Sequence, residues 1–236
     1  MITENDRLLS LLKENKITQD EYKLLSKALD KPSNLRVFLS LLINPYQKIA
    51  GLWAFLLGIG IIIAISYLGT IGKIYFPGLL GILNASMIKN PKISTDFMFL
   101  LFQNTVIWAV LTGLFIITAK ILALKGVRII DFMGTVALSR FPYLILTGFL
   151  AIMRTVNPRF MDVGMEQGLQ LKPSMLAILF SSVVIICAIW HIATYLYALK
   201  ESSGLSGKKL WISFIACILI GEIMTNFITM MPVSNM

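Results

Sequence analysis

Long apolar stretches without charge alternate with short charged segments along this 236-residue chain. An apolar run of about 18 or more residues is long enough for a helix to cross a hydrocarbon core roughly 30 Å thick. Strands of a membrane barrel would alternate apolar and polar residues, and these stretches do not, so helices are expected. The pattern therefore predicts five membrane-spanning helices. They cover about 49–71, 97–122, 129–153, 173–199 and 209–231.

The polar N-terminal region predicts two short helices that form a hairpin. The first is expected over about 4–14, with leucines mostly on one side. The second begins at Thr18-Gln19-Asp20-Glu21, which is a capping box. In this motif the Thr18 hydroxyl accepts from the third-position amide while the Glu21 side chain reaches back to Thr18.

The apolar side of this hairpin is a candidate docking face. A hairpin of this length is too small to be stable by itself, so its apolar side needs a partner. The partner is another copy of the chain, another protein or the membrane surface. The alternative is a hairpin that packs on itself as a cap beside the first span. The candidate docking residues are Leu8, Leu12, Tyr22, Leu25 and Leu29.

Composition agrees with a membrane protein, since 57% of residues are hydrophobic and only 14% are charged. The net charge of +9 does not indicate nucleic acid as a partner. Lys and Arg flank the spans, where they anchor helices and contact anionic lipid headgroups. The expected fold is all-α, with a cytoplasmic hairpin over residues 1–34 and a five-span membrane domain over residues 35–236.

Basic residues predict the orientation of the chain. With the N-terminus in the cytoplasm, the inner segments carry fourteen Lys and Arg and the outer segments carry six. The positive-inside rule therefore favours a cytoplasmic N-terminus and an outer C-terminus. We expect a bacterial cytoplasmic membrane, with the endoplasmic reticulum or Golgi as the alternative for a eukaryotic chain.

Two charged residues lie deep inside predicted spans. Arg140 is about 16 Å into the third span and Glu222 about 20 Å into the fifth, both counted from the cytoplasmic side. Ionisable groups at such depth are costly and are functional candidates. We predict that Arg140 and Glu222 pair. The pair either holds the helices together or lines a proton or substrate path.

Two further residues of the third span complete the candidate polar site. Pro142 lacks a backbone N–H, frees the carbonyl of Leu138 and predicts a kink, with Ser139 or another helix satisfying the backbone. Asp131 lies near the cytoplasmic end and is expected to pair with a basic residue there. The candidates are Arg128, Lys125 and Lys208.

The remaining motifs offer little chemistry. The only histidine, His191, has Cys187 one turn away but no carboxylate in its span, which argues against a metal site. Catalytic signatures are lacking, so we expect a non-enzymatic protein without a cofactor. Residues 74–88 are apolar but too short to cross, and they predict either a re-entrant or interfacial element or a simple loop.

The membrane body resembles the Yip domain family, named for interaction with Ypt and Rab GTPases. The resemblance rests on INPYQKIAGLWAF, DFMGTVALSRFPYLIL and YALKESSGLSGKKLWISFIACILIGEI within residues 43–228. It implies five spans, a cytoplasmic N-terminal region and a scaffold or adaptor role. The segment LLKENKITQDEYKLLSKAL is similar to the short helical-hairpin modules called SHOCT, which implies docking or self-association.

Overall fold

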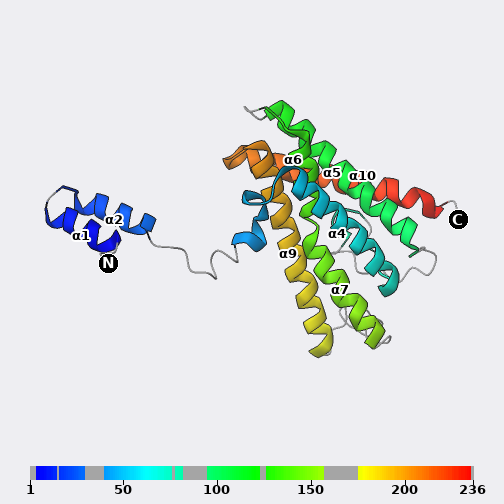
Figure 1. The fold of residues 1–236 in the computed structure, drawn as a ribbon. Helices are drawn as coiled ribbons and strands as arrows, with labels where there is room; N and C mark the ends of the chain where they lie inside the picture. The colour runs from blue at the N-terminus through cyan, green and yellow to red at the C-terminus, as the bar shows by residue number, and fades with distance from the viewer. Residues whose placement is uncertain are drawn as a thin grey trace. The chain divides into compact units, whose positions relative to one another are not determined.

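The computed structural model describes residues 4–14, 16–29, 40–75, 78–81, 95–122, 126–156 and 175–234. Every element within these ranges is a helix (Figure 1). The chain divides into two compact units, Met1–Leu42 and Ile43–Met236. The expected all-α architecture is therefore confirmed.

The first unit contains the helical hairpin. Its helices are α1 (Glu4–Lys13) and α2 (Gln19–Leu29). The predicted capping box is present: the Glu21 amide donates to the Thr18 hydroxyl at 3.2 Å, and the Glu21 carboxylate accepts from the Thr18 amide at 2.8 Å. These two bonds satisfy donors that the first turn of a helix would otherwise leave free.

The second unit contains a short 3-10 helix η1 (Pro45–Gln47) and the membrane helices. Five spans long and apolar enough to cross a membrane occur among the described residues, which confirms the predicted number. The third span consists of two helices. The helices are α4 (Gly51–Gly72), α5 (Phe97–Leu122), α6 (Ile129–Leu138), α7 (Phe141–Val156), α9 (Met175–Ser203) and α10 (Gly207–Ser234).

Helix α4 is central to the packing of this unit. It contacts α5, α6 and α7, while α9 packs against α6 and α7 and α10 packs mainly against α5. Figure 1 shows α7 and α9 running side by side and α10 passing along α5. Large apolar side chains such as Trp211, Ile215 and Ile223 of α10 are exposed, as expected for a surface that faces lipid.

Glycines allow α4 and α6 to approach closely. A Cβ atom on Gly58 would collide with the Ala137 side chain, and one on Gly134 would lie 2.8 Å from the Phe55 amide nitrogen. Small residues at such contacts let backbones pack tightly, which is a main source of helix association in a bilayer. The first and third spans are therefore joined through their backbones.

The third span is broken near its middle. Ser139 and Arg140 separate α6 from α7, and Pro142 lies in the first turn of α7. The Ser139 carbonyl accepts a bond from the Thr194 hydroxyl at 2.9 Å and lies 3.2 Å from Nδ1 of His191. The helix is therefore interrupted where the kink was predicted, and α9 bonds the carbonyl of Ser139, one residue after the predicted Leu138.

The chain after α4 turns back into the helix bundle. Lys73, the residue after α4, has the left-handed conformation, with φ of 49°. Ile74, Tyr75 and Leu79 are buried, and Leu79 lies beside Gly221. Gly221 is about 21 Å along α10 from its start, near the middle of that helix. Residues 74, 75 and 78–81 thus fold back against the helices, as a re-entrant element would, and we call them the re-entrant segment; residues 76, 77 and 82–88 lie outside the described ranges.

Candidate polar site in the membrane domain

Arg140 occupies the break in the third span and is only 2% exposed. Its guanidinium donates from Nη1 to the Asn104 carbonyl at 2.7 Å and from Nη2 to the Asn104 side-chain oxygen at 2.8 Å. The guanidinium carbon lies 5.6 Å from the centre of the Tyr143 ring, within cation–π range. Nε has no hydrogen-bond partner.

Asn104 connects three of the spans. While its oxygens hold Arg140, its Nδ2 donates to the Ser66 hydroxyl of α4 at 3.0 Å and to the Leu100 carbonyl at 2.9 Å. The polar run Gln103-Asn104-Thr105 is evident in the sequence. The structure shows that Asn104 is a member of this run that bonds to other helices. The neighbouring Thr105 hydroxyl bonds the Leu101 carbonyl of its own helix.

His191 lies next to the break, between two tyrosine rings. Its ring centre is 4.3 Å from that of Tyr143 and 4.2 Å from that of Tyr195. Because the Ser139 carbonyl can only accept, Nδ1 of His191 carries the hydrogen, and neutral His191 presents a lone pair at Nε2. Neither Nε2 nor the Tyr195 hydroxyl has a partner, although both residues are fully buried.

Tyr46 of η1 reaches the same region from outside the spans. The hydroxyls of Ser139 and Thr194 lie close enough to act on it, but neither forms a well-aligned hydrogen bond. Burial raises the pKa of Tyr46 far above its ordinary value, so the hydroxyl stays protonated. Sequence inspection missed this group because Tyr46 is far from the other two along the chain, and although His191 and Tyr195 are one turn apart on α9, the sequence does not show what they face.

Glu222 binds a different part of the structure. Its carboxylate accepts from the Leu80 amide at 2.7 Å and from the Asn226 side chain at 2.7 Å. The carbonyl of the same Leu79–Leu80 peptide faces the Tyr143 hydroxyl at 3.4 Å. One peptide group of the re-entrant segment therefore lies between α7 and α10, with a bond to each.

The predicted Arg140–Glu222 ion pair is wrong. Each residue has other partners, and the only ion pair within 4.0 Å among the described residues is Lys16–Glu14 in the hairpin. Helix α10 packs mainly against α5, so Glu222 faces the re-entrant segment instead of the helix break. Tyr195 lies within electrostatic range of both charges.

Asp131 lies in the first turn of α6, where a helix dipole favours a carboxylate. The predicted pairing with Arg128 or Lys208 is not formed within the described ranges, and Lys125 lies outside them. The Asp131 carboxylate instead lies beside Gly51 at the start of α4. It takes no part in the surroundings of Arg140.

The candidate docking residues of the hairpin differ in exposure. Leu8 is buried, Leu12 and Tyr22 are half-buried and Leu25 is 44% exposed. The side chain of Leu29 lies outside the described part of the chain. The most exposed leucine, Leu24 at 70%, was not among the candidates.

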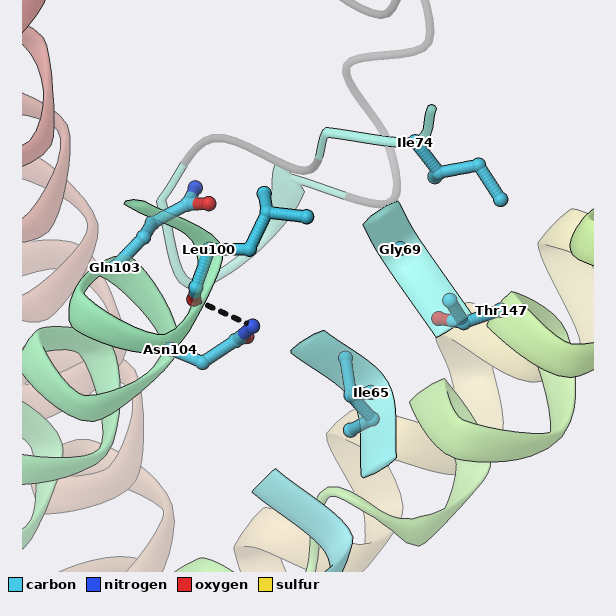
Figure 2. A pocket seen from close by; sticks show the side chains of 7 residues that line it. All are labelled: Ile65, Gly69, Ile74, Leu100, Gln103, Asn104 and Thr147. Carbon is cyan, nitrogen blue, oxygen red and sulfur yellow. Dashed lines mark hydrogen bonds between the residues drawn. The ribbon is translucent and has the colours of Figure 1, made fainter. Parts of the chain in front are cut away.

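A small cavity lies beside the Asn104 side chain. Its volume is about 10 Å³, near the lower limit for one water molecule. Figure 2 shows Asn104 and Thr147 pointing into it from opposite sides, with Ile65 of α4 between them. The walls belong to α4, α5, α7 and Ile74, so a polar position within the bundle adjoins the residue that holds Arg140.

Within the described ranges, no three His, Cys, Asp or Glu side chains are grouped as a metal site would require. Cys187 and Cys217 are free and buried. Comparison of the chain with protein-family models, curated proteins and solved structures found no match.

Proposed function

We propose that this protein is a non-enzymatic membrane scaffold or adaptor of the Yip type, which recruits a protein partner or another copy of itself through the N-terminal hairpin. The observation that carries the proposal is the hairpin's exposed apolar surface. Leu9, Leu24 and Leu25 are 42%, 70% and 44% exposed on a unit with very little core of its own. Isolated exposed leucines are ordinary, but two adjacent ones on so small a unit favour a binding face.

The proposed setting is the cytoplasmic membrane of a bacterium, with the hairpin in the cytoplasm and the C-terminus outside. The basic residues of the chain favour this orientation. Attachment to a membrane domain keeps the hairpin near the bilayer, where a partner is recruited without any chemical step. Membrane lipids surround the five spans, and nucleic acid has no role in the proposal.

Site-specific photo-cross-linking in native membranes tests the proposed docking face. A photoreactive amino acid at position 24 should give discrete cross-linked products, and the same amino acid at position 14 should not, because Glu14 is exposed but polar. Leu24→Ser with Leu25→Ser should abolish co-purification of the cross-linked protein. Identical products from both positions, or no loss on substitution, would refute the adaptor proposal.

A second candidate is a transporter, channel or lipid-handling protein. Non-helical backbone at membrane depth is tolerated where it is buried in protein or lines an aqueous cavity, and transporter sites are often built from discontinuous helices. This chain has a broken third span and a re-entrant segment close together. Solute flux into vesicles that contain the purified protein tests this candidate. Flux that is lost in Arg140→Lys at an unchanged amount of folded protein would favour it over the adaptor.

A further inference from the structure

Among the described residues, no carboxylate lies within ion-pair distance of Arg140. Arginine remains protonated in proteins, and an uncompensated charge inside a membrane domain costs several kcal/mol. The Asn104 oxygens accept two of its hydrogens but carry no net charge. Glu222, the predicted partner, is engaged by Leu80 and Asn226, and the Asp131 carboxylate lies beside Gly51.

Several polar atoms around this cation are buried without partners. They include a donor, Nε of Arg140, and the hydroxyl of Tyr195, which can donate. The Tyr143 ring connects these groups, because its centre lies 5.6 Å from the guanidinium carbon of Arg140 and 4.3 Å from the His191 ring, which is 4.2 Å from the Tyr195 ring. Buried polar atoms in folded proteins are nearly always hydrogen-bonded, and such a group of exceptions requires an explanation.

We infer that the membrane domain binds a small monovalent anion, such as chloride, beside Arg140 at the break between α6 and α7. The anion balances the guanidinium charge and accepts from Nε of Arg140 and from the Tyr195 hydroxyl. The α7 N-terminus begins at Phe141, directly after Arg140, and its dipole also favours an anion. A water molecule bound to the anion can donate to Nε2 of His191.

The inference concerns binding inside the membrane domain and does not depend on the proposed adaptor role of the hairpin. An anion would hold α7 and α9 together at the break, where the backbone bonding of the third span is interrupted. It would thereby stabilise the folded state in proportion to its concentration over its dissociation constant.

Thermal unfolding of the full-length protein in detergent tests the inference. The midpoint is followed while gluconate, a bulky organic anion, is replaced by chloride or bromide at constant ionic strength. For the natural sequence we expect a saturable rise in the midpoint. Arg140→Met should abolish the saturable response, and Arg154→Met at the other end of α7 should leave it intact.

Tyr195→Phe separates a binding role from a purely structural one. Its hydroxyl has no protein partner, so the variant should fold and should be at least as stable as the natural sequence in gluconate. The affinity for chloride should fall roughly tenfold or more, because a hydrogen bond to a charged group is lost. Tyr197→Phe is the matched change on α9. This variant should bind chloride normally, because the Tyr197 ring contacts Lys200 and not the proposed site.

Two results would overturn the inference. One is a midpoint in chloride equal to that in gluconate for the natural sequence. The other is a chloride response of the same size in Tyr195→Phe, Arg140→Met and the natural sequence, which would indicate a general salt effect. Neither result would bear on the cross-linking of the hairpin, so the two proposals fail independently.

Discussion

In the hairpin, Leu8 lies inside while Thr18 and Glu21 bond each other at the surface. In the membrane domain the order is reversed, because Arg140 and Asn104 are inside and large apolar side chains such as Trp211 are exposed. Water supplies both the hydrophobic effect and competing hydrogen bonds, and a bilayer supplies neither. Polar groups therefore determine how the spans pack, whereas in the hairpin they determine where a helix begins.

The largest effect should come from removing the partner of Arg140. Asn104→Leu removes the side-chain acceptor of a buried guanidinium and the bond to Ser66, and leaves Arg140 only the backbone carbonyl of residue 104, so it should lower the free energy of unfolding by about 3 kcal/mol. Denaturant titration in mixed micelles measures this. Combining Asn104→Leu with Arg140→Met should recover most of the loss, and Thr105→Val should have little effect. A double variant no more stable than Asn104→Leu would show that the contact does not hold the helices.

The next largest effect should come from the glycine contact between α4 and α6. Gly58→Ala forces a methyl group against Ala137 and should cost about 1–3 kcal/mol through overpacking. Gly60→Ala is the matched control, because no atom lies within 4 Å of the added carbon. The same titration compares them. Equal stability of the two alanine variants would mean that α4 and α6 can separate freely.

A smaller effect is expected at Glu222. Gln has one acceptor oxygen where the carboxylate has two, so Glu222→Gln leaves either the Leu80 amide without a partner or Asn226 with only the backbone carbonyl of residue 222. A loss of about 1.5 kcal/mol is expected. A cysteine at position 80, in a chain without Cys187 and Cys217, should then react faster with a water-soluble thiol reagent. Tyr143→Phe, which removes only the longer bond to the same peptide, should raise the rate less.

The smallest effect is expected in the capping box of the hairpin. The Thr18 amide, with a further contribution from its hydroxyl, lowers the pKa of Glu21. A carboxyl with a lowered folded pKa contributes stability above its unfolded pKa, about 4.3, and this is lost as pH falls through the folded value. Hydrogen exchange in residues 18–22, corrected for the intrinsic effect of pH, should therefore increase below about pH 4. Glu21→Gln should remove that dependence, and Glu14→Gln should preserve it.

The sequence predicted those features that depend on neighbours along the chain. Span lengths follow from apolar runs, the kink follows from Pro142, and the start of α2 follows from Thr18 and Glu21. The surroundings of Arg140 could not be predicted in this way. Hydropathy gives the depth of a residue in the membrane but not which helix lies beside it. Arg140 and Glu222 were expected at similar depth, yet α10 packs mainly against α5, and the expected pair is absent.

The close contact between α4 and α6 has a consequence for biosynthesis. Ala137 follows Gly58 by 79 positions, so a ribosome adding about 5–20 residues per second completes α6 roughly 4–16 s after Gly58 is added. During that interval the first span has no partner for its glycine face. The Ser66 hydroxyl donates to the Ile62 carbonyl of the same helix. The first span can therefore remain in lipid before the third span is made, without an unsatisfied hydroxyl. The order of translation thus makes α4 a stable template on which the third span is assembled.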